Sequence, residues 1–270
     1  MKGKIMSQPH PYPSCQKTRW PLSLLLASCV SSGALAESIQ ILYPKQITKQ
    51  EQTIIDTLES YQINTTLLDL SHSLFPFKKT LTVSYGGDQG PLYDPETHTV
   101  HIPFSFYTES LDYFRKNEYQ KNDGKSAENG AINTMLHTLL HEAGHAYIAD
   151  QNIAILGKEE DAVDNFATLL LIDYVENGDE IAISAADMFA FESEDKPEYY
   201  DLDEYLDEHS FDLQRYFATL CLVYGHNPKK HTRLLNEIEK EYRQERTEFC
   251  QIHYQTLSEN WHRYLKKANH

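Results

Sequence analysis

The chain has 270 residues and a formal net charge of −16, and 40% of its residues are hydrophobic. This composition is sufficient for a folded core and argues against wholesale disorder. The acidic balance argues against a nucleic-acid-binding surface and against docking on anionic membranes, because both need clustered Lys and Arg.

The first 36 residues differ from the rest of the chain. They contain four basic residues and no acidic one, then an apolar run at residues 20–30 and an Ala-Leu-Ala sequence that ends at Ala36. These features are typical of a cleavable secretory signal peptide, so we expect an exported protein, periplasmic or secreted. The expected mature chain, residues 37–270, keeps 20 basic and 40 acidic residues and has a net charge of −20. Residues 26–29 also match a bacterial lipidation site, so an outer-membrane lipoprotein anchored at Cys29 is the alternative.

Hydrophobic periodicity predicts an α+β fold: a small N-terminal sheet followed by a mainly helical part, in one domain over residues 37–270. Strands are expected at residues 38–43, 81–85 and 97–106. The third strand is expected towards the sheet edge because Pro103 has no backbone N–H to donate. Helices are expected at residues 49–61, 131–151, 159–175, 180–191, 211–224, 229–242 and 248–267.

The expected helix at residues 131–151 contains an HExxH sequence. His141 and His145 are four residues apart and therefore lie on one face of a helix. Two neutral imidazoles in this arrangement bind Zn²⁺, and Glu142 is placed to take a proton from the attacking water. The residues around the motif are apolar nearly all round the helix, which predicts a buried helix on which polar side chains need partners or a metal.

A catalytic zinc site needs a third protein ligand. The metzincin pattern is absent, because Ile148 and Gln151 stand where it requires Gly and His. The next helix offers Glu160 as the ligand and, one turn later, Asp164 to accept the ring N–H of a zinc-binding His. Spacing alone leaves Glu159 and Asp161 open as ligands. An acidic first turn that complements the helix dipole is the structural alternative.

After removal of the leader the chain keeps two cysteines, Cys221 and Cys250. In an exported protein, two cysteines are expected to form one disulfide, and two buried free thiols are the alternative.

Several segments together resemble a bacterial family of secreted zinc metallopeptidases. They are the HEAGHA sequence from His141, the acidic run at residues 159–167, the DEHSFDLQRYF segment from Asp207 and the Tyr-Asp-Pro-Glu turn from Tyr93. With a further segment at residues 220–225, the resemblance covers about residues 81–250, most of the expected mature chain. The resemblance implies a zinc-dependent, gluzincin-like fold with one Zn²⁺ per chain, and it gives no substrate.

Two further residues are candidates for function. His209 or Arg215 is able to stabilise the oxyanion of a tetrahedral intermediate if it approaches the metal from the far side. The structural alternatives are a helix-start residue for His209 and an ion pair with a nearby acid for Arg215.

The sequence therefore predicts a zinc-dependent endopeptidase of the cell envelope that acts on peptides or proteins, with Glu142 as general base. The alternative is a non-catalytic binding or scaffolding protein that a zinc ion stabilises. ATP-dependent membrane proteases share HEAGH, but the phosphate-binding loop that they need is absent from the sequence. The strand near Pro103 is a weaker candidate for binding an extended peptide by strand addition.

Overall fold

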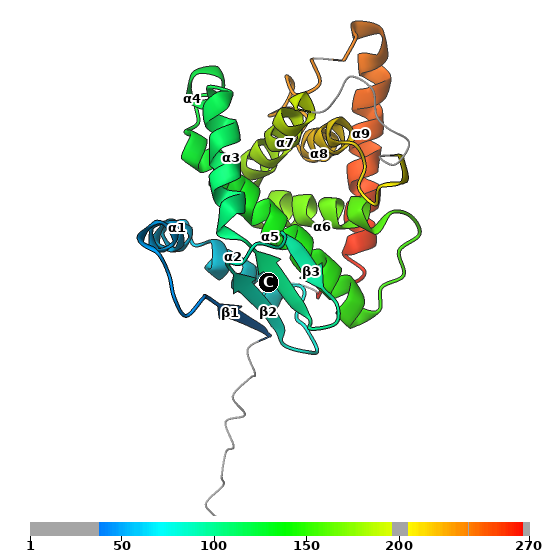
Figure 1. The fold of residues 1–270 in the computed structure, drawn as a ribbon. Helices are drawn as coiled ribbons and strands as arrows, with labels where there is room; N and C mark the ends of the chain where they lie inside the picture. The colour runs from blue at the N-terminus through cyan, green and yellow to red at the C-terminus, as the bar shows by residue number, and fades with distance from the viewer. Residues whose placement is uncertain (1–37, 196–204, 237, 267–270) are drawn as a thin grey trace, which may run out of the picture. The chain divides into compact units, whose positions relative to one another are not determined.

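A computed structural model describes residues 38–195, 205–236 and 238–266. It is mainly helical with a small sheet near the N-terminus (Figure 1), which confirms the predicted α+β class. The predicted signal peptide and Cys29 lie outside the described residues. The described elements are β1 (Ile39–Leu42), α1 (Lys49–Ser60), α2 (Ile63–Ser73), β2 (Leu81–Tyr85), β3 (Leu92–Asp94), β4 (Thr99–Ile102), α3 (Phe104–Lys116), α4 (Tyr119–Asn122), α5 (Ala127–Gln151), α6 (Glu159–Tyr174), α7 (Gly178–Glu194), α8 (Asp212–His226) and α9 (Lys240–Trp261).

The four strands form one mixed sheet in the order β1-β2-β4-β3. β1, β2 and β4 are parallel, whereas β3 is antiparallel to β4. The prediction of an edge strand near Pro103 is wrong, because β4 has a partner on each side. The strand also ends before residue 106, since Pro103 is the N-cap of α3, which begins at Phe104. Among the described strands, β3 is an edge strand.

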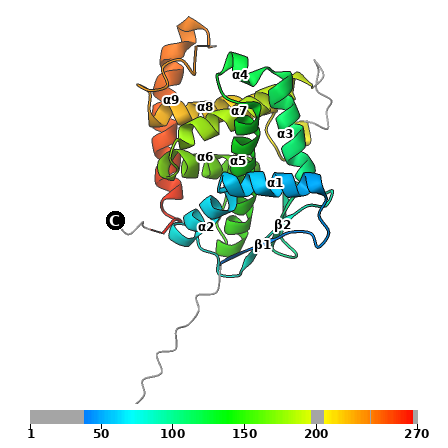
Figure 2. The same cartoon turned by 90° about the vertical axis from the view of Figure 1, so that its left-hand side faces the viewer.

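Helix α5 is the central element of the described fold. It contacts α2, α3, α4, α6, α7, β3 and β4 (Figure 2), and most of its residues are buried. The Ser126 side chain caps its start by accepting a hydrogen bond from the Asn129 N–H at 3.0 Å. The predicted buried helix is therefore confirmed, and the His141 and Glu142 side chains on its second half lie inside the protein.

Helix α6 packs closely on α5 at the HExxH turn. Gly144 makes this approach possible, because a Cβ atom there would lie 3.0 Å from the Phe166 ring and 3.1 Å from the Val163 side chain. The two helices are joined by a short loop after Asn152, which adopts the left-handed conformation that commonly ends a helix. The first two turns of α6 are thus placed beside the histidines of α5.

Helices α7, α8 and α9 pack in succession beyond α6, and the predicted disulfide Cys221–Cys250 joins α8 to α9. The predicted helix at residues 229–242 is wrong: the described residues between Lys229 and Asn236 form turns, and α9 begins at Lys240. Tertiary contacts explain the difference, since His231 is buried and hydrogen-bonded to Asp179 of α7 at 2.8 Å.

Among the described helices, none combines the length and hydropathy that a membrane crossing requires.

Candidate metal centre

The two histidines of the HExxH sequence face one carboxylate of α6. The Nε2 atom of His141 lies 3.1 Å from Oε2 of Glu160, and that of His145 lies 3.3 Å from Oε1 of the same residue. Of the three acids that spacing left open, only Glu160 lies between both rings. Glu159 instead contacts the Nδ1 atom of His145 at 2.8 Å, and Asp161 accepts a hydrogen bond from the Ser210 hydroxyl.

Each imidazole has a carboxylate on its Nδ1 atom. Asp164 contacts Nδ1 of His141 at 2.7 Å, which places it where the sequence predicted. Glu159 has the same relation to His145. The sequence did not single out this role for Glu159, which follows from the packing of α6 on α5. A proton shared at Nδ1 fixes the ring tautomer and leaves Nε2 free to bind a metal.

Arg215, from the first turn of α8, forms a two-pronged ion pair with Asp164. Its Nε and terminal nitrogen donate to the two carboxylate oxygens at 2.7 and 2.9 Å. Its guanidinium also lies over the Phe189 ring, 4.0 Å from the centroid. Burial disfavours the Asp164 carboxylate, but Arg215 and His141 outweigh this effect and hold the pKa of Asp164 well below its usual range. The sequence left two roles open for Arg215, oxyanion stabilisation and an ion pair with a nearby acid, and the structure shows the ion pair.

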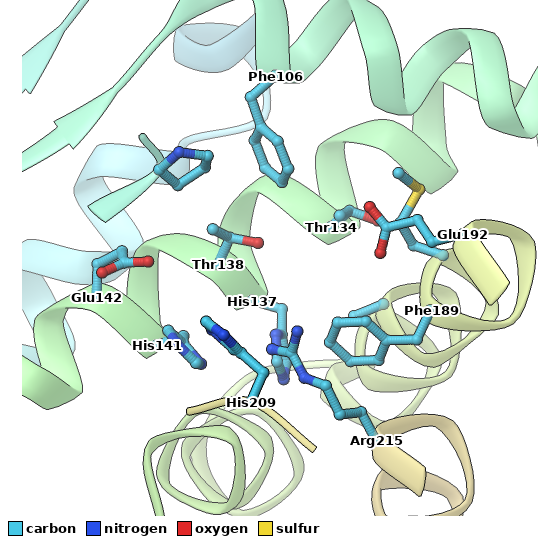
Figure 3. A pocket seen from close by; sticks show the side chains of 13 residues that line it. Phe106, Thr134, His137, Thr138, His141, Glu142, Phe189, Glu192, His209 and Arg215 are labelled. Atoms are coloured by element: carbon cyan, nitrogen blue, oxygen red, sulfur yellow. The ribbon is translucent and has the colours of Figure 1, made fainter. Parts of the chain in front are cut away.

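His209 approaches the same centre from the segment before α8. Its Nε2 atom lies 3.0 Å from Oε2 of Glu160, and its ring is nearly parallel to that of His141, with centroids 6.4 Å apart. Figure 3 shows the two rings side by side, with Glu142 on the opposite side of His141 from Arg215. The sequence pointed to His209 but gave no reason to expect contact with Glu160 itself.

Glu142 is buried on α5 with 6% of its surface exposed. Burial raises the pKa of its carboxyl, while the neighbouring histidines and a backbone hydrogen bond from Tyr93 of β3 oppose the rise. Its side chain lines two hollows. One is a groove of about 670 Å³ whose wall includes Leu92 and Tyr93, and the other is a smaller cavity of about 150 Å³ with Phe106 and Phe189 among its lining residues.

The electrostatics of the cluster suit a cation. Burial disfavours the His141 imidazolium, but Asp164 and Glu160 outweigh it and raise the pKa of His141 to about 9. Close contacts with the three imidazoles likewise hold the pKa of Glu160 far below its usual value despite burial. Oε2 of Glu160 is buried yet accepts no hydrogen bond among the described residues. The donor atoms of His141, Glu160 and His209 lie within 4.8 Å of one another, and such a group of nitrogen and oxygen donors fits a bound divalent metal.

A second group of potential ligands, Asp179, Glu180 and His231, lies at the start of α7. Lys230 pairs with Asp179, and Lys125 pairs with Glu180 at 2.8 Å. These lysines already neutralise both acids, so this group is an ion-pair cluster that fastens the turns after α8 to α7.

Comparison with known proteins agrees with this geometry. A family model described as "Putative metallopeptidase" matches residues 43–265. No curated protein and no solved structure matches the chain. The match covers most of the sequence, including α5, α6 and the segment that carries His209, and the chain belongs to this metallopeptidase family.

Proposed function

We propose that the protein is a zinc-dependent endopeptidase in which His141, His145 and Glu160 bind the metal and Glu142 is the general base. The observation that carries the proposal is that the Nε2 atoms of His141 and His145 both contact the Glu160 carboxylate. The buried Glu142 follows His141 directly in the sequence. Three protein donors of this kind leave one position of a tetrahedral zinc site open, as catalysis requires.

A bound zinc ion supplies a Lewis acid that polarises a peptide carbonyl and acidifies water. Glu142 takes the proton of the attacking water and passes it to the leaving amine. Its raised pKa suits both steps, because a base whose pKa lies closer to the working pH transfers protons in either direction. Asp164 and Glu159 hold the imidazoles in the tautomer that presents Nε2 to the metal.

The groove beside β3 is suited to an extended peptide. β3 pairs with β4 on one side only, and Leu92 and Tyr93 line the groove next to His141, Glu142 and His145. A substrate strand that pairs with the outer edge of β3 brings its backbone past the metal ligands. Backbone pairing recognises no particular side chain, so this mode of binding suits peptides of varied sequence.

The Cys221–Cys250 disulfide supports an oxidising location. We therefore propose that the protein acts outside the cytoplasm. It is either free in the periplasm or medium after removal of residues 1–36, or attached through a lipid at Cys29 after cleavage just before that residue.

Metal analysis and a screen of proteome-derived peptides test the function. The wild type is expected to contain about one zinc per chain and to cleave peptides. The Glu142→Gln variant should keep the metal and lose cleavage by about 10²–10⁴-fold, the contribution of a general base. Glu128→Gln, which changes an exposed glutamate in the first turn of the same helix, is the matched control and should remain active.

A wild-type protein that binds no zinc contradicts the proposal. A different result supports the alternative that the sequence left open, a zinc-stabilised binding protein. In that case the wild type binds zinc but cleaves no peptide, and Glu142→Gln changes neither the zinc content nor the stability.

A further inference from the structure

His209 stands in the same relation to Glu160 as the two histidines of α5. Its Nε2 atom is 3.0 Å from Oε2 of Glu160, against 3.1 Å for His141 and 3.3 Å for the contact of His145 with Oε1. With metal bonds of about 2.0–2.1 Å, neighbouring donors of a tetrahedral zinc site lie about 3.3 Å apart. The donor atoms of His141, Glu160 and His209 all lie within 4.8 Å of one another. His209 therefore offers a donor at the spacing expected for an ion that His141 and Glu160 also bind.

The tautomer of His209 also suits a ligand. Asp207 contacts its Nδ1 atom at 3.2 Å and accepts its backbone N–H at 2.7 Å. Asp207 thus favours a proton on Nδ1 of His209, as Asp164 does for His141, and the lone pair of Nε2 is left for a metal. An oxyanion-stabilising histidine needs the opposite arrangement, with a proton on Nε2.

The segment that carries His209 is fastened to the helix that carries Glu160. Lys158, the N-cap of α6, donates to the backbone carbonyls of Asp207 and His209 at 3.0 and 2.8 Å. The Ser210 hydroxyl donates to Asp161 at 2.7 Å. These three bonds on both sides of the His209 side chain hold it against Glu160. The ring nevertheless remains about half exposed, with 48% of its side-chain surface accessible.

We propose that His209 is a fourth protein ligand of the metal, which a substrate displaces. This inference rests on the proposed zinc function. Four protein donors close a tetrahedral site, whereas a catalytic site needs an open position. The half-exposed imidazole of His209 is the donor that is able to leave, because His141 and the Glu160 side chain are buried between α5 and α6. The centre is therefore closed at rest and opens when a peptide occupies the groove.

X-ray absorption at the zinc edge and zinc competition with a chelator test the assignment on the purified full chain. The wild type should show three imidazoles per zinc, and His209→Ala should show two, with zinc binding at least ten-fold weaker. Asp207→Asn keeps the imidazole but loses its Nδ1 partner, and should weaken zinc binding by about ten-fold, the effect of removing such a partner. His226→Ala, an exposed histidine at the end of α8, is the control and should change neither measurement.

The outcomes separate the two roles of His209. If His209→Ala lowers kcat/KM but leaves the zinc affinity and the imidazole count unchanged, His209 is an oxyanion-stabilising residue and the ligand assignment is overturned, while the proposed function stands. A wild type that shows only two imidazoles overturns it equally. A wild type that binds no zinc contradicts the function and the assignment together.

Discussion

Asp164 connects the metal centre to α8, and the Asp164→Asn variant tests how much this connection contributes. The substitution keeps the shape of the side chain and one acceptor oxygen. It removes the negative charge that faces the Arg215 guanidinium at 2.7 and 2.9 Å and the Nδ1 atom of His141 at 2.7 Å. Arg215 is then left as a largely buried charge, since only 15% of its side-chain surface is exposed.

Two estimates of the cost agree. Removing one partner of a buried ion pair typically costs about 3–5 kcal/mol, because the other charge stays desolvated. Coulomb's law gives about 4 kcal/mol for unit charges about 4 Å apart at an effective dielectric constant of about 20. The Phe189 ring, 4.0 Å from the guanidinium, continues to stabilise the cation, which favours the lower end of the range. We therefore expect Asp164→Asn to lower the free energy of unfolding by about 3 kcal/mol.

Urea unfolding of the metal-free protein in the presence of a chelator measures this loss without a contribution from zinc. Asp161→Asn is the control on the same helix: its carboxylate is exposed and accepts one hydrogen bond from Ser210, so a loss below about 1 kcal/mol is expected. The free energy of unfolding of the double variant Asp164→Asn/Arg215→Met should fall by less than the sum of the decreases in the two single variants, because no unpaired charge remains. Equal losses for Asp164→Asn and Asp161→Asn, or strictly additive losses in the double variant, refute the reasoning.

Three further predictions concern the rest of the fold. The Cys221→Ser/Cys250→Ser variant should lose about 3–4 kcal/mol in urea unfolding, because the disulfide closes a loop with a sequence separation of 29; an unchanged midpoint contradicts this. Burial lowers the pKa of His137 to about 4, below its unfolded value near 6.5, so between these pH values the unfolded chain binds a proton that the folded chain does not. The free energy of unfolding should therefore fall by about 3 kcal/mol more in the wild type than in His137→Gln as the pH drops from 6.5 to 4, and parallel pH curves for the two proteins argue against it. Zinc at about 100 times its dissociation constant should add about 3 kcal/mol to the free energy of unfolding of the wild type. It should add none to that of His141→Ala. If zinc raises the melting temperature of both proteins equally, it binds elsewhere.

The sequence predicted the part of the centre that lies within single helices. His141 and His145 follow from one helical turn, and Glu160 and Asp164 follow from the same spacing on the next helix. The structure brings these four side chains together, as expected from a short loop between two packed helices. Spacing was informative here because both helices are regular and buried.

What the sequence did not predict depends on contacts between distant segments. The contact of His209 with Glu160, and the partnership of Asp207 with its ring, require the segment before α8 to fold back on α6. No local periodicity encodes that contact. The turns near His231 were mistaken for a helix for the same reason, since a buried bond to Asp179 outweighs local helix propensity.

The sequence analysis also missed β3 and α2, for different reasons. β3 has three residues, so alternation between its faces is not detectable in the sequence. Helix α2 follows α1 after Gln62, which has a positive φ of 56° and separates two helices that have no Gly or Pro between them. Since β3 is an edge strand beside the groove, the element that was hardest to predict is one on which the proposed peptide binding depends.

The spread of the donor set along the chain has a consequence for folding kinetics. His141 and Asp164 are 23 residues apart, whereas Asp164 and Arg215 are separated by 51. Closing the shorter loop costs less chain entropy and brings Glu160 to the histidines as soon as the α5–α6 hairpin forms. Under the proposed function, α5 and α6 carry three of the zinc ligands, so this helix pair would be able to bind zinc before α8 docks. Docking of α8 brings Arg215 to Asp164, and the segment before α8 brings His209 to Glu160, so the loop lengths favour completion of the proposed centre in this order.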